Sequence, residues 1–304
     1  MSLSQDYSDS DLYCHEEASD VVSQDTNFCD HIDLYSNSDF LPDEESSIVS
    51  AFDSEIDQVL DSDMIRRFRN DPGFVSARVE AVNWILTVHA YYQFRPETAY
   101  RCVNYLDRFL LSTTLPKGKG WSLQLLSVAC LSLAAKMEEI SVPLLLDLQT
   151  KEPKFMFNPK TIQRMELMVM AVLKWRLRLM TPFDFVHHFI SKRSSIGFQS
   201  ECDQKHVVSH TSDIVVLTCQ VIDFLDYSPS AIAAAAVICG ADRHVDDEIF
   251  GCFHHRVSRE RVRKCYNLMK HRISLLPHNK TPKLEPEPGH VCLLDAAKIG
   301  VTRT

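Results

Sequence analysis

The sequence is poor in glycine, with 8 residues in 304, well below the usual share of about 7%. A fold with many tight turns, or one that cradles phosphate groups in glycine-rich loops, would need more of it. No run of about 18 apolar residues occurs either, so we expect no membrane span. Apolar residues still make up 45% of the chain, which is ordinary for a globular protein. The composition therefore favours an all-α fold.

Basic residues are missing from the first 63 positions, which hold 18 of the 41 acidic residues and no Lys or Arg. The remaining 241 residues carry 23 acids and all 32 bases, a net charge of +9. Residues 1–48, rich in Asp, Ser and Glu, cannot bury enough apolar surface to offset chain entropy. We predict that this acidic tail is disordered, and that residues 279–304, with three prolines among charges, are disordered too.

Recognisable catalytic and metal-binding patterns are also missing. The ten cysteines include no CxxC pair, which suggests reduced thiols in a reducing compartment. Gly118 and Gly120 supply only part of a dinucleotide-binding loop, and no P-loop, nucleophile elbow or HExxH occurs. His254, His255 and Cys252 are only a fragment of a zinc site. We therefore expect no metal, no cofactor and no chemistry carried out by this chain alone.

Between the tails, the sequence shows helical periodicity and clear helix starts. Capping side chains precede proline at Asn158-Pro159, Thr181-Pro182 and Ser228-Pro229, Pro96 opens another helix, and Ser122 is expected to cap the helix after Trp121. Residues 231–238, AIAAAAVI, are apolar all round, which is typical of a central buried helix. We predict a short helix near residues 50–69, then two helical units at 49–179 and 180–278.

Apolar residues at helical spacing predict which helix faces are buried. The predicted stripes are Val75, Val79, Val82, Leu86 and Ala90; Cys102, Val103, Leu106, Phe109 and Leu110; Leu123, Leu126, Cys130, Leu133, Ala134 and Met137; and Ile162, Met165, Val169, Val172 and Leu173. Lys136 ends one of these apolar helices, and Glu166 sits beside the apolar stripe of another. Two such charges on facing helices predict an ion pair at a rim.

The acidic tail contains Leu12, Cys14 and Glu16 in the pattern LxCxE. In an extended peptide these alternate side chains point one way into pockets, while main-chain groups bond to a groove. Neighbouring acids would be attracted to a basic rim. The pattern resembles the docking motif for the pocket of retinoblastoma-family proteins. The alternative is a chance triplet in a tail of low complexity.

Three further segments carry a second resemblance. They are Arg78-x-x-Ala81-x-x-Trp84, the run Leu133-Ala134-Ala135-Lys136-Met137-Glu138-Glu139, and Arg164-Met165-Glu166 leading to Val172-Leu173-x-Trp175-x-Leu177. Over roughly residues 50–275 the chain resembles a cyclin. With LxCxE in front it is similar to the D-type cyclins, most closely the plant kind. The resemblance implies two tandem five-helix cyclin folds.

The resemblance also implies roles for single residues. Lys136 and Glu166 match the family's pair that engages the kinase, where charge-assisted hydrogen bonds to its backbone would form. Met137, Trp175 and Leu177 match apolar kinase-contact positions. The alternatives are an ion pair with a purely internal role for the first two, and core packing for the other three.

One surface departs from the family pattern. Many cyclins carry an apolar patch on the first core helix that docks RxL-type substrates, and Trp84 fits it. Ala77, Glu80 and Ala81 stand where larger apolar residues are common, and Thr87 stands where an acid is common. Recruitment of substrates is therefore expected to depend on LxCxE.

The function implied is that of a regulatory subunit that activates a cyclin-dependent kinase and recruits a retinoblastoma-related protein for phosphorylation, promoting the G1/S transition. The implied partners are an A-type plant kinase, the retinoblastoma-related protein and kinase-inhibitor proteins, in nucleus and cytoplasm. Thr281-Pro282 is a candidate phosphorylation site. One alternative is a cyclin-fold transcription factor that binds DNA and transcription proteins, although the acidic tail and the spread of the core's charge argue against it. An enzyme of unknown chemistry is the other.

Overall fold

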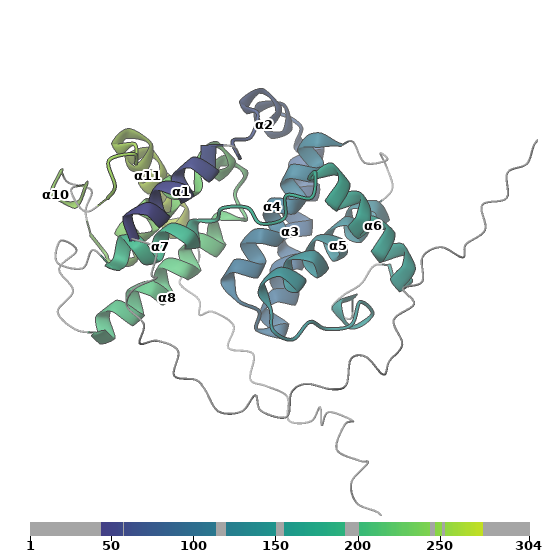
Figure 1. The fold of residues 1–304 in the computed structure, drawn as a ribbon. Helices are drawn as coiled ribbons and strands as arrows, with labels where there is room; N and C mark the ends of the chain where they lie inside the picture. Colours follow the sequence, from purple (N-terminus) through teal and green to yellow (C-terminus); the bar gives the residue numbers. More distant parts are fainter. Residues whose placement is uncertain are drawn as a thin grey trace, which may run out of the picture. The chain divides into compact units, whose positions relative to one another are not determined.

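The computed structural model describes residues 44–56, 58–113, 120–149, 155–191, 201–243, 247–250 and 253–275. Over these ranges the chain forms helices, 3₁₀ turns and connections, with no strand (Figure 1). The prediction of an all-α fold is confirmed.

The first half of the fold is built around one apolar helix. Its elements are α3 (Pro72–Tyr92), α4 (Pro96–Ser112), α5 (Gly120–Glu138), η1 (Asp147–Gln149) and α6 (Pro159–Val172). Helix α5 contacts α3, α4 and α6. It is long and apolar enough to cross a membrane by length and composition, yet 67% of that stretch is buried within the fold. That burial is what the central helix of a helical core requires.

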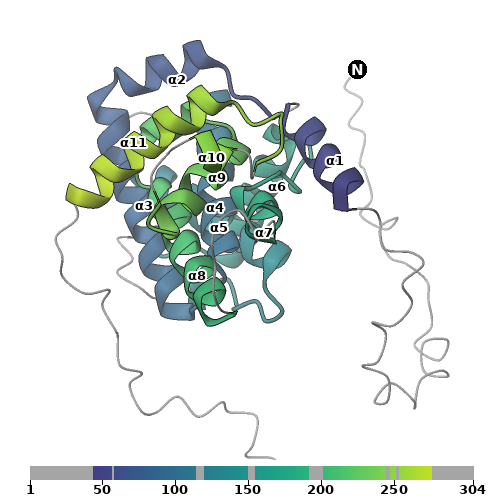
Figure 2. The same cartoon turned by 90° about the vertical axis from the view of Figure 1, so that its left-hand side faces the viewer.

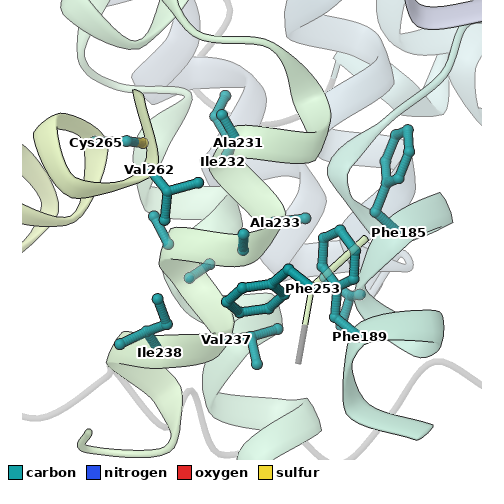
Figure 3. Close-up of a cluster of buried hydrophobic side chains, with 14 of the residues drawn as sticks. Phe185, Phe189, Ala231, Ile232, Ala233, Val237, Ile238, Phe253, Val262 and Cys265 are labelled. Atoms are coloured by element: carbon teal, nitrogen blue, oxygen red, sulfur yellow. The ribbon is translucent and has the colours of Figure 1, made fainter. Parts of the chain in front are cut away.

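The second half repeats this plan. Its elements are α7 (Pro182–Ser191), α8 (Glu201–Thr218), η3 (Ile222–Asp226), α9 (Pro229–Gly240), α10 (Asp247–Phe250) and α11 (Arg259–Leu275). Helix α9 contacts α7, α8 and α11, and every residue of AIAAAAVI is buried. Figure 3 shows Ala233 and Val237 of α9 facing the rings of Phe189 and Phe253, with Val262 and Cys265 of α11 on the other side.

Two helices precede the halves, where the sequence predicted one helix near residues 50–69. Helix α1 (Glu44–Ile56) begins earlier than expected, so the predicted tail of residues 1–48 is helical from Glu44. Its side chains Ile48 and Phe52 enter the core of the second half. Helix α2 (Ser62–Arg69) starts afresh because the Asp61 carboxylate accepts hydrogen bonds from the first backbone N–H groups, those of Asp63 and Met64. Figure 2 shows α1 and α2 as separate segments.

The stripe predicted on α3 is confirmed at Val82 and at Leu86, which packs against the core, and it is wrong at two other positions. Val79 and Ala90 are exposed, and the buried positions are Arg78, Ala81, Val82, Ile85 and Val88. Arg78 lies inside because its guanidinium donates to both carboxylate oxygens of Asp107, at 2.6 and 2.7 Å. Because the charged residue Arg78 lies on the buried face of α3, the pattern of apolar residues did not identify that face fully.

The chain between the halves is fixed by side chains of α4. Arg101 Nη1 donates to the carbonyls of Leu177 and Leu179, at 3.1 and 3.2 Å, and the Tyr105 hydroxyl donates to the Leu177 carbonyl. Arg78 Nη2 also donates to the carbonyl of Cys219 in the second half, at 3.0 Å. Buried polar bonds of this kind hold the connection in one arrangement.

Candidate functional site: a charged pair on an apolar rim

Lys136 and Glu166 are brought together by the contact between α5 and α6. Lys136 lies in the last turn of α5 and Glu166 in the middle of α6. The Lys136 Nζ atom donates to both Glu166 oxygens, at 2.7 and 2.9 Å. The ion pair predicted from the sequence is therefore present.

The two partners are unequally exposed, with 46% of the Lys136 side chain and 7% of the Glu166 side chain open to solvent. A carboxylate this buried would be costly without a partner. Glu166 therefore holds the Lys136 ammonium group in place. On its solvent-exposed side, the ammonium group can still donate a hydrogen bond. Such a pair can present a fixed, directional donor to the backbone carbonyl of another protein.

Trp175 is the most exposed of the three apolar site residues, at 66%. Lys174 and Trp175 follow α6 in the left-handed backbone region, with φ of 53° and 61°. The Trp175 N–H donates to the Met170 carbonyl at 2.8 Å, which closes the end of the helix. With this backbone the indole of Trp175 points outwards. Its exposure excludes core packing as the role of this side chain.

Met137 and Leu177 have different environments. Met137 follows Lys136 on α5 and is exposed. Leu177 is half-buried and packs against the core of the first half, while its carbonyl is held by Arg101 and Tyr105. Leu177 therefore combines core packing with the surface position expected from the sequence.

Further exposed apolar side chains lie close in the sequence to the ends of these two helices or to Glu166, and the sequence analysis did not single them out. They follow α5, precede α6 or flank Glu166 on it: Ile140, Val142, Leu144, Leu146, Phe155, Met156, Leu167 and Met168. Exposed apolar groups mark an interaction surface where they form a contiguous patch. The signal available in the sequence was the apolar run from Ile140 to Leu146, where a loop between helices is usually polar.

The patch on α3 differs from the rim. Trp84 is half-buried and packs against the core. Ala81 is buried, and Glu80 and Thr87 are exposed. The small and polar side chains that depart from the family pattern thus lie around a tryptophan that is largely committed to packing.

Burial governs the ionisable groups inside the fold. It acts to lower the pKa of the Arg78 guanidinium, but the charge and hydrogen bonds of Asp107 outweigh it, and that pKa is raised. Burial raises the pKa of the thiols of Cys102, Cys130, Cys219, Cys239 and Cys265. Such thiols are inert rather than nucleophilic. Among the described residues, no group of three or more His, Cys, Asp or Glu side chains is placed to hold a metal ion.

The remaining predicted site residues, Leu12, Cys14, Glu16 and Thr281, lie outside the described residues. Their roles stay predictions.

Comparison with known families gives two matches in tandem. The model described as "Cyclin, N-terminal domain" matches residues 48–178, and "Cyclin, C-terminal domain" matches residues 180–288. The change from one model to the next falls in the segment that connects the two halves.

Similar curated proteins include Cyclin-D1-1 of Arabidopsis thaliana, 42% identical over 277 residues, which cover 86% of this chain and 76% of that protein. Cyclin-D4-1 of Arabidopsis thaliana is 40% identical, covering 72% of each chain. Cyclin-D2-1 of Oryza sativa subsp. japonica is 42% identical, covering 74% of this chain and 70% of its own.

Similar solved structures share the fold at low sequence identity. A viral cyclin from herpesvirus saimiri has a TM-score of 0.52 and 16% identity, covering 64% of this chain and 85% of its own. A chain of the yeast RNA Pol II CTD kinase CTDK-1 complex has a TM-score of 0.54 and 13% identity, covering 70% and 71%. These likenesses bear on the fold alone.

Proposed function

This chain belongs to the cyclin family, among the D-type cyclins, and from that premise we propose that it is the regulatory subunit of a cyclin-dependent kinase of the plant A type. The observation that carries the proposal is the Lys136–Glu166 pair, a half-exposed ammonium anchored by a buried carboxylate beside exposed apolar side chains. One of the solved neighbours is a chain of a kinase complex, in keeping with such a partner.

The mechanism is one of contact rather than chemistry. The rim formed by Lys136, Met137 and Trp175 binds a mobile helix of the kinase and holds it in the active position. Shifting such an equilibrium from 1:99 to 99:1 requires about 5.5 kcal/mol of differential affinity. A few desolvated anchors such as Trp175, with one directional ammonium donor, are sufficient for this magnitude.

Substrate recruitment is assigned to the tail. Leu12, Cys14 and Glu16 bind the pocket of a retinoblastoma-related protein and tether it to the active kinase. Tethering raises the effective substrate concentration towards the mM range. Phosphorylation of the bound protein then promotes the G1/S transition.

Three finer parts of the proposal rest on the resemblance and the composition. The protein acts in nucleus and cytoplasm, the kinase complex is a target of kinase-inhibitor proteins, and Thr281 before Pro282 is phosphorylated. Thr281 stands directly before a proline, in a segment rich in proline and charge.

Removing both members of the rim pair tests the kinase role. Lys136→Ala with Glu166→Ala leaves no uncompensated buried charge, so the fold is expected to survive. We expect the variant to lose co-purifying kinase activity from dividing plant cells, with helical circular dichroism unchanged. Trp175→Ala, which removes an exposed side chain, is expected to weaken co-purification in the same direction.

A matched control is available on α11, where Lys264 Nζ and Glu260 Oε1 form an exposed pair at 2.7 Å. Lys264→Ala with Glu260→Ala removes the same two side-chain types from the second half and is expected to retain the kinase. Undiminished co-purification by the rim variant, or kinase activity of this chain alone, contradicts the proposal.

The tail is tested separately. Cys14→Ala with Glu16→Ala is expected to abolish pull-down of the retinoblastoma-related protein while kinase binding persists. The control is Asp25→Ala with Asp30→Ala, which changes acids of the same tail outside LxCxE. Pocket-protein binding that survives the first substitution pair, or is lost equally with the second, removes the motif from the proposal.

A further inference from the structure

A cavity of about 260 Å³ opens between the segment linking α1 to α2, the end of α4 and the segment after α6. Among the residues that the structure describes, its charged lining consists of Arg108, Lys174 and Arg176 against one acid, Asp61. The remaining walls are largely apolar and include Val59 and Leu111. Opposite charges interact more strongly beside apolar walls than in open water. The cavity is distinct from the Lys136–Glu166 pair.

Arg108 is the most buried of these cations and has only neutral partners among the described residues. Its Nε donates to Asn104 Oδ1 at 2.7 Å, and its Nη2 donates to the Gln58 carbonyl at 2.6 Å. Burial lowers the pKa of this guanidinium, as expected for a cation without a facing carboxylate. A guanidinium has five N–H donors, so further donors are available to a ligand.

Lys174 and Arg176 reach the cavity from the left-handed turn that exposes Trp175. The φ of Lys174 is 53° and that of Trp175 is 61°. Left-handed conformations cost about 1–3 kcal/mol each for residues other than glycine, and they collect at functional sites. Neither cation has an acidic partner within the part of the chain that the structure describes. The turn therefore places at one opening two cations that have no acidic partner among the described residues.

The single acid is already engaged. Asp61 Oδ1 accepts the N–H of Asp63 at 2.8 Å and that of Met64 at 3.5 Å, because it caps α2. Among the described lining residues, three positive charges against one negative charge leave an excess of two. A phosphate monoester carries about −1.5 to −2 at pH 7 and three acceptor oxygens, which matches this excess, whereas a carboxylate matches half of it.

We propose that this cavity is a binding site for a phosphoryl group, held by Arg108, Lys174 and Arg176. Ligand pockets for larger molecules usually measure about 300–1,000 Å³, so the volume suits a single phosphate or phosphorylated side chain rather than a nucleotide. The site goes beyond the kinase role and stands independently of it, because it is tested on this chain alone. Its position beside Trp175 means that occupancy would stiffen the turn that presents the indole.

The test is calorimetric titration of the full chain with inorganic phosphate and with N-acetyl-phosphoserine amide, at constant ionic strength set with sodium chloride. We expect saturable binding by the wild-type chain. Lys174→Glu with Arg176→Glu should weaken it at least about tenfold, because two charge-assisted contacts become repulsive. The matched control is Lys160→Glu with Arg178→Glu, which makes the same change of net charge at two exposed cations outside the cavity lining.

The control variant is expected to bind within about twofold of wild type, since two exposed charges outside the lining are largely screened by salt. Tighter binding of the phosphoserine compound than of inorganic phosphate assigns the site to a phosphorylated protein segment, and equal binding assigns it to the free anion. Absence of saturation in the wild-type chain, or equal weakening in both variants, overturns the proposal. Circular dichroism of each variant establishes that lost binding does not reflect unfolding.

Discussion

Arg78 and Asp107 form a bidentate ion pair inside the first half, where both side chains are almost fully buried. Removing one partner of such a pair leaves an uncompensated charge in the interior, which costs about 3–5 kcal/mol. We therefore expect Asp107→Asn to lower the free energy of unfolding by that amount, measured by urea denaturation. Because Arg78 also donates a hydrogen bond to the Cys219 carbonyl of the second half, we expect the substitution to destabilise both halves.

An exposed pair provides the comparison for this prediction. Asp63 and Arg66 on α2 are both about 70% exposed, and surface pairs contribute about 0–1 kcal/mol. Asp63→Asn should therefore change stability little. If Asp107→Asn lowers the free energy of unfolding no more than Asp63→Asn does, the prediction for the buried pair is wrong.

Glu55 is a second buried charge, and it joins α1 to the start of α9. Its carboxylate accepts the Ser230 N–H at 2.6 Å and the Ser230 hydroxyl at 2.8 Å. Burial raises its pKa above the ordinary value of 4.5, outweighing the hydrogen bonds and nearby arginines that lower it. The folded protein therefore binds this proton more tightly than the unfolded chain does.

The sign of the pH dependence follows from that difference. The stability contributed by Glu55 is fully present below its ordinary pKa, falls as pH rises through the raised folded-state pKa, and is flat above it. Urea denaturation of wild type and Glu55→Gln from about pH 4 to about pH 7 isolates this contribution. We expect the wild-type advantage to shrink with rising pH, and a constant or growing advantage would contradict the assignment.

At the scale of elements, α8 and α9 approach each other closely at Gly240. A Cβ there would collide with Thr211 Oγ1 and lie 3.2 Å from the Thr211 backbone nitrogen and 3.3 Å from its Cα. Backbone atoms cannot swing aside as a side chain can. We expect Gly240→Ala to cost about 1–3 kcal/mol of unfolding free energy, measured by thermal or urea denaturation.

Two variants sharpen this prediction. Thr211→Ala should restore only part of the loss in the double variant, because the backbone contacts remain. Gly120→Ala is the matched control: its Cβ would meet nothing within 4 Å, so a gain of up to about 1 kcal/mol is expected. Full rescue by Thr211→Ala would show that the hydroxyl alone limits the approach of the two helices.

The elements that the sequence predicted well are those in which local signals agree. Asn158 and Ser228 cap α6 and α9 as expected, the predicted stripe on α4 is buried from Cys102 to Leu110, and α9 is buried throughout. The errors arise where a long-range contact overrides a local pattern. Arg78 is buried only because Asp107 faces it, and no periodicity rule could place a guanidinium there. Ser122, expected as a cap, lies within α5 because that helix begins at Gly120.

The candidate site also contains features that the sequence could predict and features that it could not. The Lys136–Glu166 pair could be predicted because Lys136 ends an apolar helix and Glu166 sits beside the apolar stripe of another. The exposure of Trp175 depends on two residues in the left-handed backbone region. A glycine would have indicated such a conformation in the sequence, but neither residue is glycine. The cationic cavity joins Asp61, Arg108 and Lys174 from three segments, and their proximity is a property of packing alone.

At the scale of the whole molecule, α1 binds the core of the second half although it precedes the first. Ile48 and Phe52 are buried there, and Phe52 stacks on His254 with ring centroids 4.9 Å apart. Gln58 Oε1, just beyond the helix, accepts the N–H of Met180 at 2.9 Å. The helix therefore ties the start of the chain to the connection between the halves and to the second core.

Two truncations separate the contribution of α1 from that of the tail. Deleting residues 1–43 removes only the segment that composition predicts to be disordered, so thermal unfolding should be nearly unchanged. Deleting residues 1–57 also removes Ile48 and Phe52, each worth about 1.5–3 kcal/mol when buried, and should lower the unfolding free energy by about 3–6 kcal/mol. Phe52→Ala in the full chain should itself cost about 3–5 kcal/mol, because the cavity it leaves in the core adds to the lost burial. Equal stability of the two truncated chains would mean that α1 does not contribute to the stability of the fold. A loss of stability on deleting residues 1–43 would mean that the acidic tail folds.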